Sequence, residues 1–282
     1  MRASSRVRSW LAGYERRPWG FYAVASLIYV FLFAPILLVV VNSFNTDVYS
    51  ISWKGFTLHW YAEAWSNPTV VAAAKTSLII AVSVTVIATV IGTAGALALE
   101  RSGRLTRGLI QLTIYGRLVI PELVLAIALL ILLTRLNVTR GTLTIIIGHV
   151  VFDTAYVTVI VAARLAARDP STEEAARDLG ATRFRAFRRV TLPEIMPAVA
   201  AAALLAFTFS LDDVVTSYFL SGSTNTLPLV ILSFIRFNAS PVVNALGTSL
   251  LVVNSICLSA FLAVNWRRAA MTRRRADAPV LV

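Results

Sequence analysis

Residues 164–194, RLAARDPSTEEAARDLGATRFRAFRRVTLPE, form a polar and charged segment between two long apolar stretches of this 282-residue chain. The segment is typical of two short amphipathic helices. Ser171, with Glu174 three residues later, predicts a capping box at the start of the first helix. Gly180 predicts the end of that helix, because glycine readily adopts the left-handed conformation found there. Thr182 is positioned to cap the second helix.

An apolar stripe runs along one face of the second helix. Phe184, Phe187 and Val190 recur every three residues among arginines, and Pro193 is expected to end the helix. Apolar side chains in a segment that lies in water must be covered by the protein itself or by a partner. The segment is therefore expected to be a contact surface.

The rest of the chain is strongly apolar. Hydrophobic residues make up 57% of the sequence and charged residues only 14%, against roughly 25% charged residues in soluble domains. Six stretches reach the roughly 20 apolar residues that a helix needs to cross a bilayer. They lie at residues 21–42, 76–99, 109–133, 143–163, 195–220 and 246–266. The sequence therefore predicts an all-α integral membrane protein with six transmembrane helices.

The net charge of +12 is distributed unevenly. Lys and Arg concentrate before the first span, between the second and third, between the fourth and fifth, and after the last. The positive-inside rule places these segments, and with them both termini, in the cytoplasm. The expected organisation is a basic N-terminal segment 1–20, a transmembrane domain 21–266 with the loop 164–194, and a basic tail 267–282. This topology explains the positive charge without nucleic acid.

The sequence shows few residues that could bind a metal or catalyse a reaction. Cys257 is the only cysteine, and His59 and His149 are far apart in the sequence, so no disulfide within the chain and no metal site are expected. A GxxxxGK[ST] phosphate-binding loop is missing, as is a convincing nucleophile–base set. We therefore assign no catalytic residue and expect neither ATP hydrolysis nor any other enzyme activity.

Local signals refine the spans. Aromatic residues at helical spacing over 58–65 predict a short helix at the outer surface, ended by Asn67 and Pro68. Pro121 and Pro197 are expected to break or bend the helices that contain them. A row of small residues in the second span predicts close packing against a neighbouring helix. The row consists of Ala88, Gly92 and Ala96.

Four acidic residues fall inside the predicted spans. They are Glu122, Asp153, Asp212 and Asp213. Glu122 and Asp153 are expected near mid-depth of the third and fourth spans. Ionisable side chains in a membrane usually face a cavity or a partner. These carboxylates are therefore candidates for a cation pathway, with Tyr156 and Tyr218 adding cation–π attraction.

Structural roles are the alternatives for the same residues. Glu122 could pair with Arg117, five positions earlier, and Asp153 could join His149 in a polar contact between two helices. The alternative role for Asp212 and Asp213 is to cap or bind loop backbone.

The polar segment resembles a known signature. The pattern Glu174-Ala175-Ala176-x3-Gly180-x9-Val190-x-Leu192-Pro193 is similar to the EAA signature of permease subunits of binding-protein-dependent ABC importers, with valine where isoleucine is common. The resemblance implies coupling helices that dock in a groove of a separate ATPase. The implied coupling residues are Glu174, Ala175, Ala176, Gly180, Phe184, Phe187, Leu192 and Pro193.

The resemblance extends to the polyamine branch, the spermidine/putrescine permeases. The stretches that carry it are residues 36–45, 121–126, 209–214, 217–222 and 226–229. It implies the six-helix, MetI-like fold of type I ABC importers and a polyamine cargo. Asp153 departs from the family, in which a small or apolar residue is expected at this position.

The same resemblance implies a set of partners. They are a second, PotB-like permease subunit, a dimer of PotA-like ATPase subunits that holds ATP and magnesium, and a PotD-like external substrate-binding protein. This chain itself would bind no cofactor and would lie among the lipids of a bacterial cytoplasmic membrane. Alternatives are an importer for ferric ion, an amino acid or another organic cation, an ATPase-independent secondary transporter or channel, and a membrane scaffold or enzyme.

Overall fold

The computed structural model describes residues 19–49, 52–237 and 241–276. Nearly all of the expected N-terminal segment 1–20, and the end of the expected tail 267–282, lie outside these ranges. In the described part of the chain there is no β-strand, only an isolated bridge between Asn45 and Phe56.

The described helices follow one another with short connections. Helices α2 to α7 are α2 (Trp19–Asn42), α3 (His59–Ser66), α4 (Pro68–Arg101), α5 (Arg104–Val119), α6 (Glu122–Arg135) and α7 (Thr142–Ala166). The next are α8 (Ser171–Asp178), α9 (Arg183–Ala186), a π-helix (Phe187–Thr191), α10 (Leu192–Asp212), α11 (Val215–Leu220), α12 (Leu227–Phe237) and α13 (Val242–Ala276).

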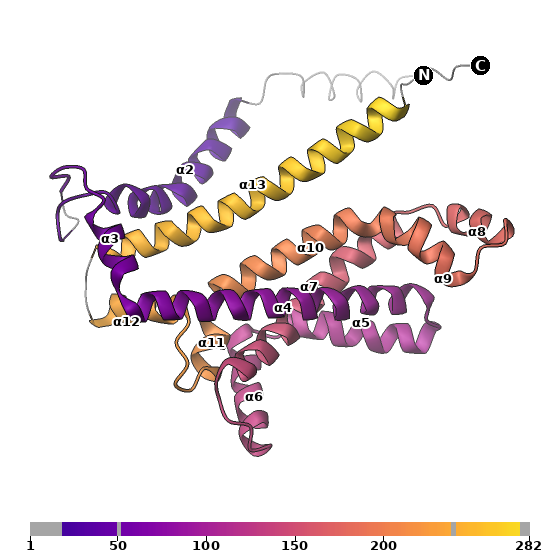
Figure 1. Cartoon of the computed structure of the whole chain (residues 1–282), viewed down its shortest axis with the longest axis horizontal. Coiled ribbons are helices and arrows are strands. Elements are labelled where there is room, and N and C mark those ends of the chain that lie inside the picture. Colours follow the sequence, from indigo (N-terminus) through magenta and orange to yellow (C-terminus); the bar gives the residue numbers. More distant parts are fainter. Residues whose placement is uncertain (1–18, 50–51, 238–240, 277–282) are drawn as a thin grey trace, which may run out of the picture.

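Three long helices, α4, α7 and α10, form the centre of the bundle and run side by side (Figure 1). The predicted row of small residues lies on α4 where it meets α7, and all three residues are buried. A Cβ on Gly92 would come within 2.6 Å of the Val157 side chain. The close helix approach that the small residues predicted is therefore confirmed.

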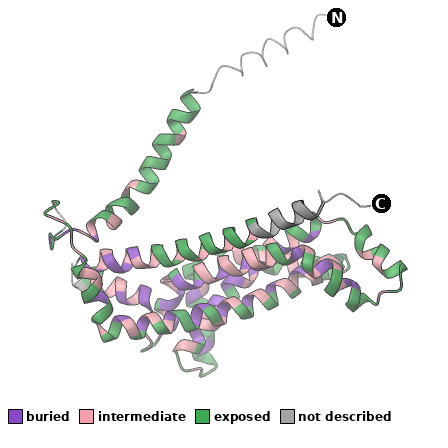
Figure 2. Cartoon of the chain, turned by 45° about the horizontal axis from the view of Figure 1, so that its top comes forward, coloured by how far each residue is buried: buried purple, intermediate pink, exposed green. Residues whose placement is uncertain are grey.

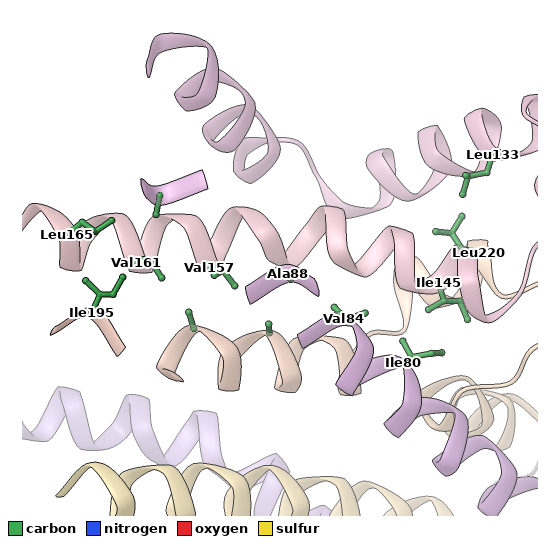
Figure 3. Close-up of a cluster of buried hydrophobic side chains, with 13 residues drawn as sticks. Ile80, Val84, Ala88, Leu133, Ile145, Val157, Val161, Leu165, Ile195 and Leu220 are labelled. Atoms are coloured by element: carbon green, nitrogen blue, oxygen red, sulfur yellow. The ribbon is translucent and has the colours of Figure 1, made fainter. Parts of the chain in front are cut away.

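The buried core lies along these three helices (Figure 3). Its labelled members are Ile80, Val84, Ala88, Leu133, Ile145, Val157, Val161, Leu165, Ile195 and Leu220. A second apolar cluster joins α3, α4, α12 and α13 at one end of the bundle. Both clusters contain mainly branched and small side chains, which interdigitate without polar atoms.

The six-span fold is confirmed, with changes in the third and fifth spans. Five helices are long and apolar enough to cross a membrane, and α5 with α6 completes a sixth as a broken pair bent by 111°. The predicted third span, 109–133, is therefore divided between two helices, and the break predicted from Pro121 is confirmed. The predicted fifth span, 195–220, is wrong beyond Asp212, because the chain turns extended at Asp213 before α11 begins.

The two ends of the bundle carry different elements (Figure 1). Helices α8 and α9 lie at the same end as the last turns of α13, and α3 and α12 lie at the opposite end. The short helix expected over 58–65 is confirmed as α3. Asn67 has a second role, because its side chain accepts the Thr69 N–H and so caps α4, with Pro68 in the first turn.

Helix α2 lies apart from the central bundle (Figure 2). None of its residues is buried, and its contacts within the chain are with α13. This strongly apolar helix of 24 residues therefore faces lipid or another subunit rather than the core of this chain.

Candidate functional site

A cavity of about 680 Å³ opens between the two broken helix pairs and α7. It is lined by the α5–α6 break, the α10–α11 break and the middle of α7. Five of the six residues predicted for the substrate pathway contribute to its wall: Glu122, Asp153, Tyr156, Asp212 and Asp213. The chain thus gathers residues that lie up to about 90 positions apart into one acidic space, here called the central cavity.

Glu122 occupies the first position of α6, directly after the break at Pro121. Thr216 on α11 donates a hydrogen bond to its carboxylate at 3.3 Å. Glu122 thus lies at a helix break rather than within a continuous helix, because the chain changes direction between the end of α5 and the start of α6. The alternative ion pair with Arg117 is not found within 4.0 Å in the described structure.

Asp213 occupies the second break, where α10 ends. Its carboxylate accepts the backbone N–H of Ser217 at 3.1 Å, which is the capping role considered as an alternative. His149 Nε2 lies 3.6 Å from Asp213 Oδ1. The two ring nitrogens of His149 also contact the hydroxyls of Ser210 and Ser217, at 2.8 and 3.2 Å. His149 therefore joins α7 to both α10 and α11.

Asp153 and Asp212 differ in environment. Asp153 is only 3% exposed, and its Oδ2 has no hydrogen-bond partner. Asp212 is exposed and accepts a hydrogen bond of 2.7 Å from the Asn254 side chain on α13. In the described part of the chain, the polar contact between helices that was the alternative for His149 and Asp153 is made by His149.

One cation lines the central cavity beside the acids. The Arg117 guanidinium carbon lies 3.4 Å from the centroid of the Phe152 ring and 6.0 Å from that of Tyr156. Such contacts contribute about 0.5–2 kcal/mol. Tyr156 also meets the Phe209 ring edge-on at 5.1 Å. The sequence indicated Arg117 only as a countercharge and did not indicate Phe152.

Tyr218 lies outside the central cavity. It is on α11, 53% exposed, and its ring faces Arg236 at 5.9 Å. The structure therefore separates it from the other predicted pathway residues.

The central cavity has the chemistry of a cation site. Four carboxyl groups and one guanidinium line it, and aromatic rings form part of the wall. A cation with several charges could exchange its hydration for carboxylate oxygens and ring faces along this space. Among the described residues no cluster of three or more His, Cys, Asp or Glu has metal-binding geometry.

The second candidate region is the end of the bundle formed by α8, α9 and the π-helix. The predicted capping box is wrong. The helix begins one residue earlier than predicted, at Ser171, with Pro170 as its N-cap, so Ser171 makes no side-chain cap. Instead the Asp169 carboxylate accepts the Ser171 N–H at 2.9 Å. Gly180, at φ +86°, ends α8 as predicted. Thr182 caps α9 as predicted, accepting the Arg185 N–H.

The apolar stripe is only partly covered. Phe184 is 71% exposed and Leu179 is 90% exposed, whereas Phe187 and Val190 are half-buried. Glu174 and Ala175 are exposed on α8, and Ala176 is half-buried. This end of the bundle therefore exposes apolar and acidic side chains side by side.

Pro193 does not end the second helix, contrary to the prediction. The π-helix runs directly into α10, and the Leu192 N–H bonds to Phe187 five residues earlier. The wider turn accommodates the proline ring and its missing N–H within a continuous helix. Leu192 packs against the central core, so this helix joins the exposed end rigidly to the bundle.

A buried ionic network, here called the Arg168 network, lies beneath α8. Arg168 is 6% exposed and donates to Glu100 at 3.1 Å, to Glu173 at 2.9 Å and to Thr191 at 3.2 Å. Thr191 in turn donates to Glu173 at 2.6 Å, and Arg101 lies 3.5 Å from Glu173. The Thr191 hydrogen bond, with the help of Arg168, holds the pKa of Glu173 below its ordinary value.

Comparison with known proteins identifies the family of the chain. Residues 88–270 match the family described as binding-protein-dependent transport system inner membrane component. The chain belongs to this family. It is thus a multi-pass membrane subunit of a transport system, and its relatives are permease subunits rather than enzymes.

Two relatives and one solved structure define its place in this permease family. The spermidine/putrescine transport system permease protein PotC of Escherichia coli (strain K12) is 40% identical over 234 residues, which cover 83% of this chain and 89% of PotC. The putrescine transport system permease protein PotI of the same strain is 39% identical over 257 residues, covering 88% and 90%.

The solved structure is a chain from a bacterial ABC transporter involved in the import of the acidic polysaccharide alginate. It aligns with a TM-score of 0.68 at 18% identity and covers 94% of this chain and 98% of that chain. At this identity the likeness shows the fold alone.

Proposed function

We propose that this permease carries polyamines such as spermidine and putrescine, and that the central cavity is its half of the translocation pathway. The observation that carries the proposal is that one cavity gathers Glu122 at one helix break, Asp212 and Asp213 at another, and Asp153 in the middle of α7. The names of PotC and PotI support the same cargo class. Broken helices that line a cavity are a recurring way to build a transport site.

The driving force comes from a separate ATPase that docks on the α8–α9 end. The contact is formed by four exposed residues: Glu174, Ala175, Leu179 and Phe184. The continuous helix from α9 into α10 carries the motion of that contact to Asp213 at the other end of α10. The remaining coupling residues, Ala176, Gly180, Phe187, Leu192 and Pro193, shape this surface.

The partners follow from the same proposal. A second permease subunit supplies the other half of the pathway, and an external substrate-binding protein delivers cargo to the α3–α12 end. ATP and magnesium are held by the ATPase dimer. The α8–α9 end, and both termini with it, would lie in the cytoplasm.

Reconstitution of the complete transporter tests this function. Vesicles that contain both permeases and the ATPase should accumulate labelled spermidine only with ATP and the binding protein. Uptake of ferric ion or an amino acid in place of spermidine would reject the cargo. Uphill uptake by this chain alone would reject the ATPase coupling and favour a secondary transporter.

A further inference from the structure

Arg117 occupies an unusual position for a cation in an acidic cavity. Its guanidinium lies over the Phe152 ring, with the charged carbon 3.4 Å from the ring centroid. The carboxylates of Glu122, Asp153 and Asp213 line the same cavity. Within the described part of the chain, however, Arg117 makes no ion pair within 4.0 Å.

The hydrogen-bonding groups around this side chain are incompletely paired. The Arg117 Nε is buried without a hydrogen-bond partner, and so is the Oδ2 of Asp153. A structural arginine normally satisfies its donors with carboxylate or carbonyl oxygens. The unused donor and acceptor in one cavity indicate a charge arrangement that is complete only when a further group is present.

We propose that Arg117 is a tethered substitute for one ammonium group of the substrate and sets the selectivity of the central cavity. In the empty cavity its guanidinium occupies the face of Phe152 and offsets part of the negative charge. An incoming polyammonium chain displaces it from the ring and takes up the free carboxylate oxygens. This proposal rests on the proposed function, because it concerns how the same cavity distinguishes its cargo.

The arrangement has a direct consequence for selectivity. A cation with a single charge must compete with a covalently attached guanidinium and therefore gains little binding free energy. A chain with several ammonium groups can bind the outer carboxylates first and then displace the arginine. Phe152 is a suitable face for either cation, since a ring attracts guanidinium and ammonium alike.

Binding measurements on the complete transporter test this proposal. The change is Arg117→Met, which keeps side-chain length and removes the charge. In nanodiscs without binding protein, labelled spermidine should bind the variant about tenfold more tightly than the original protein. Labelled guanidinium ion should bind saturably to the variant but not to the original protein, and adding Asp153→Asn should abolish that binding.

Matched variants keep the test decisive. Arg135→Met, at an exposed position on α6, should leave both affinities unchanged, and Arg117→Lys should stay within about threefold of the original. If Arg117→Met does not assemble, Arg117→Gln provides the same comparison. Unchanged or weaker spermidine binding in the assembled variant, with no guanidinium binding, would overturn the proposal.

The two probes separate this proposal from the cargo assignment. If no form of the transporter binds spermidine, but guanidinium ion binds only when Arg117 is removed, the polyamine assignment is wrong and the displacement proposal stands. If the original protein binds spermidine and neither probe responds to the substitution, the displacement proposal alone is wrong.

Discussion

The Arg168 network and the central cavity are both clusters of opposite charges inside the same helical bundle, yet their hydrogen bonding differs. Arg168 donates to two carboxylates and a hydroxyl, and Glu173 accepts from both Arg168 and Thr191. In the Arg168 network Glu100 Oε2 lacks a partner but the guanidinium is paired, whereas in the central cavity Arg117 makes no such bond and Asp153 Oδ2 has no partner. A paired guanidinium fixes a structure, whereas an unpaired one beside carboxylates and an open space is typical of a site that binds something.

The largest effect is expected from removing the centre of the Arg168 network. Arg168→Met leaves Glu100 and Glu173 without their shared partner, and breaking a buried ion pair costs about 3–5 kcal/mol. We expect a large fall in thermal stability and nearly complete loss of uptake. Arg104→Met, at an exposed position in the first turn of α5, is the control. Unfolding temperatures equal for the two variants would contradict the role given to the network.

Two neighbouring glutamates sharpen the comparison. Glu173 lies in the Arg168 network, whereas Glu174 is exposed on α8. Glu174→Lys should lower ATP-driven uptake about thirtyfold, the equivalent of one strong docking contact of about 2 kcal/mol, without affecting membrane insertion or stability. Glu173→Gln should instead lower stability. Uptake assays beside unfolding curves separate the two, and normal transport by Glu174→Lys would exclude the docking role.

Neutralising the central cavity should affect transport more than assembly. We expect the double variant Asp212→Asn, Asp213→Asn to reduce spermidine uptake about tenfold, because each carboxylate contributes a charge-assisted contact to the cation. Co-purification of the other subunits should remain normal. A variant with unchanged uptake would mean that these carboxylates serve only Asn254 and the backbone of α11.

The smallest expected effect depends on pH. The pKa of Glu173 lies below its ordinary value of 4.5 in the folded chain. Its ionised form therefore stabilises the protein above that pH, and the contribution is lost as the pH falls through the folded-state pKa. Thr191→Val removes the principal cause and should cost about 1 kcal/mol at pH 7.

The measurement for this prediction is thermal unfolding between pH 7 and pH 3. The stability difference between Thr191→Val and the original chain should narrow as the pH falls below about 4.5. Thr172→Val is the control, because the Thr172 hydroxyl bonds to a backbone carbonyl that does not titrate. If the stability difference between Thr191→Val and the original chain stayed constant with pH, ionisation of Glu173 would not be linked to the Thr191 hydrogen bond.

The sequence was most informative where the signal is local. Apolar length predicts the spans, Gly180 predicts the end of α8 and Thr182 predicts the cap of α9, because each depends on residues within one or two turns. Pro121 signalled the break in the third span. The break at Asp213 carries no proline or glycine to mark it, so a continuous apolar pattern concealed it.

The parts that escaped prediction depend on distance in the sequence. Glu100 and Arg168 are 68 positions apart and meet only because α4 and α7 pack side by side. The contact of Arg117 with Phe152 likewise follows from the packing of α5 against α7. A single sequence shows which residues carry charge, but the partner of each charge is decided by tertiary packing.

The π-helix Phe187–Thr191 gives the connection between the exposed end and the bundle one more residue per turn than an ordinary helix would need. Because the wider turn absorbs one extra residue, deleting one residue within it would restore regular winding and leave Phe184 on nearly the same side of the helix. The same deletion within α10 would rotate everything on its N-terminal side by about 100° around the helix axis. The angle at which Phe184 meets a motor protein therefore tolerates a change of length at the π-helix but not within α10.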